Sequence, residues 1–277
     1  MHPTLNKVQT LPEIINIARA AGKAILEVYE SMPESGLDFK TKGDGSPLTI
    51  ADQKAHLLIE AALQKLTPQI PILSEESYHE VGDKRLNWPI YWLVDPLDGT
   101  KEFIKRNGEF TVNIALIENR KPVLGVVHTP IQGVTHFGTV EGGAFIQAGD
   151  QAPTPIRTAP LSRDNAIIVA SRSHMSDEVK AFQANLATQI KQVECISMGS
   201  SLKLCLVAEG KADYYPRLGL TSEWDTGAAQ CVVEAAGGKV VAPNGEQLLY
   251  SKSDILNPWF LVIGDTSVEI DFEGMIT

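Results

Sequence analysis

The segment at residues 91–100 constrains this chain more than any other. It reads Tyr-Trp-Leu-Val-Asp-Pro-Leu-Asp-Gly-Thr, an apolar run that ends in two aspartates three residues apart. The run predicts a buried strand, and Pro96 and Gly99 predict a change of direction where that strand ends. Asp95 and Asp98 can therefore turn toward one point.

Oxygen atoms that converge on one point are typical of a magnesium site rather than a zinc site, and the Leu97 carbonyl is a further oxygen within the segment. An isolated pair of aspartates can also be a turn whose carboxylates cap backbone N–H groups. Phosphatases with an aspartate nucleophile carry a related Asp-x-Asp-Gly-Thr motif, but here the acids are three residues apart instead of two. The spacing favours water activated by a metal over an aspartate nucleophile.

Two further acidic sites stand at the ends of predicted elements. Residues 72–77 end an apolar run with Glu75 and Glu76, and neighbouring residues of a strand face opposite ways, so only one of the two is expected to bind a metal. Asp225 stands at the start of a predicted apolar helix, where an N-cap is the alternative role. Acids at three separate strand and helix ends predict one site that the fold assembles.

The first half of the chain predicts an α+β arrangement. An amphipathic helix starts from a capping box at Thr10 and Glu13, and a second helix starts at Thr49 and is ended by Pro68. Short apolar runs bounded by turn residues then predict successive strands. These strands are expected at residues 70–73, 90–94, 111–117, 123–127 and 133–137.

Residues 150–155 contain two prolines among small residues and are the best candidate for a boundary. We therefore expect two units, residues 1–150 with most of the acidic site and residues 151–277 with Asp225. In the second unit strands alternate with helices, which predicts an α/β half, and a ligand is expected between the units. The strands are expected at residues 166–170, 193–197, 213–215 and 239–242, and the helices at 176–190, 200–209 and 225–236.

Charge and cysteine content narrow the range of partners. Lys and Arg number 24 against 34 Asp and Glu, a net charge of −10, so a broad basic surface for a nucleic acid polymer is not expected. The three cysteines form no Cys-x-x-C pair, and we find no signal peptide and no apolar run for a membrane span. These features predict a cytoplasmic protein, with association with the inner face of the cell membrane as an open alternative. Either a monomer or a homodimer is expected, and the sequence does not choose between them.

The motifs together resemble the lithium-sensitive, magnesium-dependent inositol monophosphatase superfamily. Its signature is a strand that ends in Asp-Pro-x-Asp-Gly-Thr, a preceding Glu-Glu pair and a distant Trp-Asp, which occur here in that order. Segments at residues 42–47, 101–103, 171–174 and 199–203 are similar to those of its 3′(2′),5′-bisphosphate nucleotidase branch. The resemblance extends from about residue 11 to residue 242 and implies a layered αβαβα sandwich.

The resemblance implies a site that holds two or three Mg²⁺ ions and a water molecule for in-line attack on a phosphate. The implied metal ligands are Glu75, Asp95, Asp98, Asp225 and the Leu97 carbonyl. The implied catalytic residues are Asp44, Glu75 and Thr100, of which Asp44 and Thr100 would orient or deprotonate the water.

Candidate substrate contacts come from the residues and from the resemblance. Gly199 and Ser200 precede a predicted helix, where N–H groups and hydroxyls can hold a phosphate, although Ser200 could instead be an N-cap. Lys203 lies one turn further and could supply a positive charge, and Arg217 is a further candidate. The full candidate set is Glu75, Leu97, Asp98, Gly99, Thr100, Ser173, His174, Gly199, Ser200, Lys203, Arg217 and Asp225.

The implied reaction removes the 3′-phosphate of adenosine 3′,5′-bisphosphate, or of its sulfated analogue, and links the protein to sulfate assimilation. An inositol monophosphatase or a sugar bisphosphatase is the alternative with the same chemistry. A sensor that binds magnesium and a nucleotide without catalysis is the alternative from another class. Clustered acids that hold magnesium would explain how an acidic protein binds so anionic a substrate.

Overall fold

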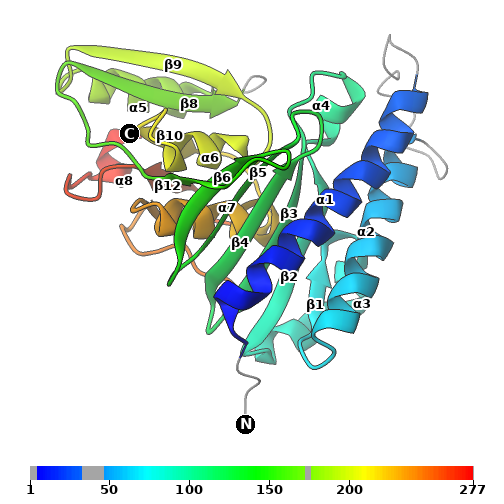
Figure 1. Cartoon of the computed structure of the whole chain (residues 1–277). Helices are drawn as coiled ribbons and strands as arrows, with labels where there is room; N and C mark the ends of the chain where they lie inside the picture. The colour runs from blue at the N-terminus through cyan, green and yellow to red at the C-terminus, as the bar shows by residue number, and fades with distance from the viewer. Residues whose placement is uncertain (1–4, 33–46, 172–175, 277) are drawn as a thin grey trace.

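Two helices, α1 (Lys7–Ser31) and α2 (Pro47–Leu66), lie side by side across one face of a seven-stranded sheet (Figure 1). Side chains of both helices pack into one core with the facing residues of the sheet, among them Ile14, Ile59 and Trp92. The strands of this sheet, in spatial order, are β1 (Ile72–Ser74), β2 (Ile90–Asp98), β3 (Thr111–Glu118), β4 (Lys121–Thr129), β5 (Val134–Thr139), β6 (Gly143–Ala148) and β7 (Thr154–Ile156). The β1–β2 pair is parallel and the other neighbours are antiparallel.

The computed structural model describes residues 5–32, 47–171 and 176–276. Three residues with roles implied by the resemblance, Asp44, Ser173 and His174, lie outside the described residues. Within the described part of the chain, no helix combines the length and apolar character that crossing a bilayer requires.

A second, five-stranded sheet completes the layers. Its strands, in spatial order, are β11 (Lys239–Val241), β12 (Phe260–Ile263), β10 (Tyr214–Arg217), β8 (Asn165–Ser171) and β9 (Gln192–Met198). The helices α6 (Leu202–Ala208) and α7 (Glu223–Ala235) lie between the two sheets, whereas α5 (Asp177–Leu186) and α8 (Phe272–Met275) cover the outer face of the second sheet (Figure 1). This arrangement is the predicted αβαβα sandwich.

Short helical turns complete the described elements. They are the 3₁₀ helices η1 (Glu75–Ser77) and η2 (Gly82–Asn87) and the helices α3 (Tyr78–Val81) and α4 (Thr100–Ile104).

A glycine on β4 lets α7 approach the first sheet closely. A Cβ atom on Gly125 would lie 2.1 Å from the backbone oxygen of Ala228 and 2.8 Å from the Cys231 side chain. Real Cβ contacts are never this short, so a larger residue would force the helix away from the sheet. The close approach sets the distance between α7 and the first sheet, which both contribute residues to the site described below.

The predicted helix starts were wrong by a few residues. α1 is capped by Asn6, whose side chain accepts from the Gln9 N–H at 3.1 Å, and Thr10 lies inside the helix with its hydroxyl bonded to the Asn6 carbonyl. α2 begins at Pro47, before Thr49, because proline is well suited to the first helical position. In α1 the Asn6 cap, four residues before Thr10, extends the helix beyond the start predicted from the sequence.

Several elements lay outside the predicted set, among them β6, β7 and β12. β7 overlaps the predicted linker at residues 150–155, because its residues pair with β6 as a further edge strand. The chain passes from the first sheet to the second between Ile156 and Asn165. The division into units of residues 1–150 and 151–277 stays a prediction.

Candidate metal site

An irregular pairing at the end of β2 brings Asp95 and Asp98 together. The register with β3 shifts between these two residues, so that Pro96 and Leu97 stand opposite a single residue of β3. A β-bulge of this kind bends the strand and re-aims its side chains. The Leu97 N–H donates to Asp95 Oδ1 at 3.1 Å, which holds the first carboxylate in place.

Gly99 allows the chain to turn directly after the bulge. Its φ angle of +94° lies in the left-handed region, and a Cβ atom there would lie 3.0 Å from the Glu109 carbonyl oxygen. Glycine adopts this conformation without steric cost, so α4 can begin at Thr100. Asp98, Gly99 and Thr100 are each half-buried at this turn.

Asp225 reaches the same point from α7. The helix begins at Glu223, not at Asp225 as predicted, because Ser222 is the N-cap and Asp225 occupies the third helical position. The two residues form a capping box in which the Ser222 N–H donates to Asp225 Oδ2 at 2.8 Å. Asp225 can therefore take part in the capping box and belong to the acidic cluster at the same time.

One carboxylate oxygen from each of Asp95, Asp98 and Asp225 lies within 4.8 Å of the others. Glu75 stands close enough for its charge to act on Asp95 and Asp225. Glu75 and Glu76 lie in η1 and not on a strand, so the argument from strand alternation does not apply, although Glu75 is half-buried and Glu76 is exposed.

Burial and mutual repulsion make the charged forms of these acids costly. Burial, followed by the charges of Glu75 and Asp98, raises the pKa of Asp95 well above its usual range. Burial and the charge of Asp98 raise the pKa of Asp225 to about 7. A divalent cation would relieve both effects, and a set of carboxylate oxygens is the donor set that Mg²⁺ prefers. The chemistry of this cluster therefore fits a hard metal ion.

The segment before α6 holds Asp98 in place. The Ser200 hydroxyl, the Ser201 N–H and the Ser201 hydroxyl all donate to Asp98 Oδ2, at 2.6, 2.7 and 2.9 Å. The Gly199 N–H donates to Glu109 Oε2 at 2.8 Å. These donors, which the sequence assigned to a phosphate, have carboxylate partners in the structure. The helix begins at Leu202 with Ser201, not Ser200, as its N-cap residue.

A cleft lies beside the carboxylates. Of the predicted substrate contacts, those that line it are Asp98, Gly99, Gly199, Ser200, Lys203, Arg217 and Asp225. Lys101, Ser201 and Tyr215 also line it and were not among the predicted site residues. Lys101 lies in a segment that the resemblance singled out, whereas Ser201 and Tyr215 are residue types that carry no local signal of a site.

Two cations face the acids across this cleft. Lys203 is buried, its Nζ donates to the Ser200 carbonyl at 2.7 Å, and it lies 5.5 Å from the centre of the Tyr215 ring. Burial lowers the pKa of Lys203 to about 8. The Arg217 Nη2 donates to the Leu220 carbonyl at 2.8 Å, while its buried Nε has no hydrogen-bond partner in the described part of the molecule. The cleft thus contains both acids of a cluster that fits a metal ion and the positively charged side chains of Lys203 and Arg217.

Comparison with known proteins gives a consistent assignment. The model of the inositol monophosphatase family matches residues 7–259. The 3′(2′),5′-bisphosphate nucleotidase CysQ of Salmonella typhimurium is 46% identical over 256 residues, which cover 91% of this chain and 98% of that protein. The crystal structure of CysQ from Bacteroides thetaiotaomicron, described as a bacterial member of the inositol monophosphatase family, is 44% identical, with a TM-score of 0.83 over 94% of this chain and 98% of that one.

A more distant structure shares the fold. An inositol monophosphatase from Zymomonas mobilis is 22% identical and superposes with a TM-score of 0.77 over 99% of this chain and 98% of that one. The family model covers most of the sequence, including every described carboxylate of the cluster. This chain belongs to the inositol monophosphatase family.

Proposed function

We propose that this protein is a magnesium-dependent 3′(2′),5′-bisphosphate nucleotidase that converts adenosine 3′,5′-bisphosphate to AMP and phosphate. The convergence of Asp95, Asp98 and Asp225 beside a cleft that contains Lys203 and Arg217 carries this proposal. The identity of 46% with a CysQ nucleotidase over almost its full length supports the choice of substrate. The sulfated analogue would be a second substrate.

The proposed site holds two or three Mg²⁺ ions through oxygen ligands. The residues that would hold them are Glu75, Asp95, Asp98, Asp225 and the Leu97 carbonyl. When bound, magnesium lowers the pKa of water and offsets negative charge on phosphate oxygens, as enzymes of this family require in general.

The chain's own residues supply orientation and charge. Hydrogen bonds from Ser201 to Asp98 and from Ser222 to Asp225 fix two of the carboxylates before substrate arrives, so little reorganisation is needed during reaction. Asp44 and Thr100 would orient or deprotonate the attacking water, with the Asp44 carboxylate as the group able to accept the proton. Lys203 would remain mostly protonated at pH 7 and attract the phosphate.

Substrate contacts fall into two groups. Gly99 lines the cleft at the turn after β2, and with Thr100 it would meet the scissile phosphate. Gly199 and Ser200 also line the cleft, and they would contact the phosphate only by exchanging their bonds to Glu109 and Asp98. Arg217 offers a guanidinium at the wall of the cleft for a second phosphate or a ribose. Ser173 and His174 are proposed on the resemblance alone.

We also propose a cytoplasmic protein that acts as a monomer or homodimer on a small nucleotide. All three cysteines are free, and two of them are buried, as is usual for proteins in a reducing compartment. The overall charge of −10 disfavours a nucleic acid polymer as substrate.

Phosphate release by the purified protein with Mg²⁺ tests the substrate assignment. We expect kcat/KM for adenosine 3′,5′-bisphosphate to exceed that for inositol 1-phosphate and fructose 1,6-bisphosphate by about 100-fold or more, because a polar site rejects substrates that leave its groups unpaired. A higher value on inositol 1-phosphate would replace the nucleotidase with an inositol monophosphatase. Magnesium and nucleotide binding without phosphate release would support a sensor instead.

Replacement of Asp98 with asparagine should abolish turnover and leave the fold intact. The amide oxygen of D98N would accept the hydrogen bonds from Ser200 and Ser201, which turns an NH₂ group, a poor metal ligand, toward the cluster. We expect kcat/KM to fall by about 1000-fold, together with weaker Mg²⁺ binding in calorimetry. Wild-type kcat of D98N at saturating Mg²⁺ would contradict the assignment.

Magnesium should stabilise the protein most at neutral and alkaline pH. The pKa of Asp225 is about 7 in the folded metal-free protein, compared with an ordinary value of 3.8. Between about pH 4 and pH 7 the folded state therefore binds more protons than the unfolded state, and the free energy of unfolding falls as pH rises. The rise in Tm with Mg²⁺ should therefore be larger at pH 8 than at pH 5.

The D225N variant is the control for this pH dependence, since His136 also titrates, with a pKa raised to about 10. Without metal, the Tm of D225N should fall less than the wild-type Tm between pH 4 and pH 7. Parallel pH curves for the two proteins would show that Asp225 is not the titrating group.

A further inference from the structure

A buried carboxylate that the proposed mechanism does not use lies two residues before Asp225. Glu223 is the first residue of α7 and has no exposed surface. Its Oε1 accepts from the Lys252 N–H at 2.9 Å and from Lys252 Nζ at 2.7 Å, and its Oε2 accepts from the Ser251 N–H at 3.0 Å and from the Tyr91 hydroxyl at 3.4 Å. Every lone-pair direction of this carboxylate therefore has a donor.

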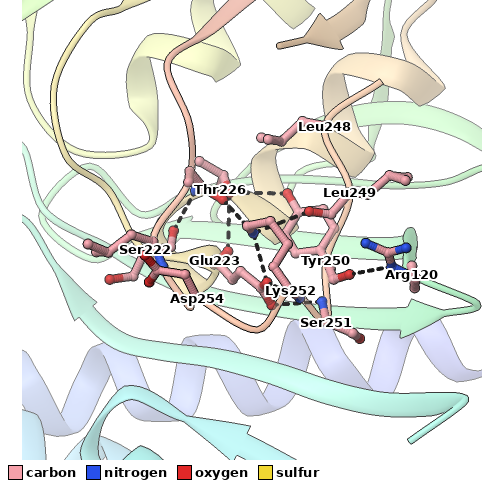
Figure 2. Close-up of polar contacts among 12 residues, drawn as sticks. Arg120, Ser222, Glu223, Thr226, Leu248, Leu249, Tyr250, Ser251, Lys252 and Asp254 are labelled. Carbon is pink, nitrogen blue, oxygen red and sulfur yellow. Dashed lines mark hydrogen bonds and ion pairs between the residues drawn. The ribbon is translucent and has the colours of Figure 1, made fainter. Parts of the chain in front are cut away.

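The side chain of Lys252 also has all of its hydrogen-bonding groups paired. Besides Glu223, its Nζ donates to the Leu249 carbonyl at 3.2 Å and to Asn257 Oδ1 at 3.1 Å, so all three ammonium protons are used (Figure 2). Figure 2 shows that the segment at residues 248–252 passes along the first turn of α7, with Glu223 and Lys252 at the point of contact. The ion pair fastens this segment to the start of the helix.

The same contacts reach the capping box of Asp225. The Asn257 Nδ2 donates to the Ser222 carbonyl at 2.8 Å and to the Thr226 hydroxyl at 3.1 Å. The Glu223 N–H donates to the Ile255 carbonyl at 3.0 Å. Residues 251–257 thus hold the backbone around Ser222 in place, and the N–H of Ser222 in turn holds Asp225.

Glu223 also joins α7 to the strand that carries the other two acids. The Tyr91 hydroxyl, which donates to Glu223, belongs to β2, and β2 ends at Asp95 and Asp98. The Ser251 hydroxyl donates to the Tyr91 hydroxyl at 3.2 Å. The position of α7 relative to β2 therefore depends on hydrogen bonds that meet at one carboxylate.

Stability alone does not account for this ion pair. A buried pair can often be replaced by apolar residues with no loss of stability, whereas a fixed hydrogen-bonding pattern specifies one geometry. The ammonium of Lys252 also balances the Glu223 charge, so this carboxylate adds little repulsion to the nearby acidic cluster.

We propose that Glu223 is a positioning residue that, through Ser251, Lys252 and Tyr91, sets the place of Asp225 relative to Asp95 and Asp98 and so tunes the affinity for the divalent cation. This inference rests on the proposed metal site. Because the Glu223 carboxylate is bonded to Lys252, Ser251 and Tyr91, its role is exerted through Asp225. Residues that orient metal ligands typically change metal affinity by about 10 to 100-fold when they are replaced.

The test compares E223Q with E234Q in the full-length protein. In E223Q the NH₂ group of the new amide must face the N–H donors of Ser251 or Lys252. This disturbs the hydrogen bonds to residue 223, although the side chain keeps its size. Glu234 lies at the other end of α7, where it accepts from Gln230 and Gln247, and is the matched control.

Binding of Mn²⁺ to the substrate-free, folded proteins is measured by electron paramagnetic resonance, alongside Tm and steady-state kinetics. We expect E223Q to bind Mn²⁺ about 10-fold more weakly, and E234Q to bind it as the wild type does even if its Tm is lower. At saturating metal, the KM of E223Q for the nucleotide should stay within about twofold of the wild-type value, because the substrate contacts are retained.

Unchanged Mn²⁺ affinity in E223Q, or equal weakening in E234Q, would overturn the positioning role. If E223Q does not fold, the double variant E223Q/K252M, which leaves no unpaired buried charge, is measured in its place with the same expectation. Wild-type protein that binds no Mn²⁺ would overturn both the proposed function and this inference. Wild-type binding with an unaffected E223Q would overturn this inference alone.

Discussion

The repulsion among these clustered carboxylates is the constraint on which the rest of this structure depends. Asp95, Asp98 and Asp225 bring oxygen atoms within 4.8 Å of one another, and burial raises the cost of the charges of Asp95 and Asp225. Without a bound cation, the folded state would be more stable if these groups were farther apart or protonated. The fold keeps them together, and a cation is the natural partner for the site that results. A cation held there would allow the proposed phosphate substrate to bind in a protein of net charge −10.

Each carboxylate is held by donors from a different part of the chain. The bulge of β2 supplies an N–H for Asp95, the segment before α6 supplies two hydroxyls and an N–H for Asp98, and the capping box of α7 supplies an N–H for Asp225. Since α7 also contacts both sheets, its placement decides whether the three groups meet. The close approach at Gly125 acts on this placement at the middle of the helix, and the Glu223–Lys252 pair acts on it at the first turn.

The sequence predicted the cluster because Asp95 and Asp98 end an apolar run and Asp225 stands near the start of an apolar helix, which are patterns of neighbouring residues. The change from consecutive strands to alternating strands and helices predicted an α+β half followed by an α/β half, and the family resemblance implied the layered sandwich. The sequence did not predict what Gly199 and Ser200 bind, because their partners Glu109 and Asp98 lie about 90 and 102 residues away along the chain. Glu223 was missed for the same reason, since its partner Lys252 has no local relation to it.

The central claim is that these three carboxylates form one metal site, and a crystal of the protein grown with Mn²⁺ tests it most directly. Anomalous diffraction would locate the ion independently of any activity. We predict a peak at about 2.1 Å from oxygens of Asp95, Asp98 and Asp225. Crystals in which Mn²⁺ occupies other positions, while these three carboxylates remain without an ion at millimolar metal, would contradict the account.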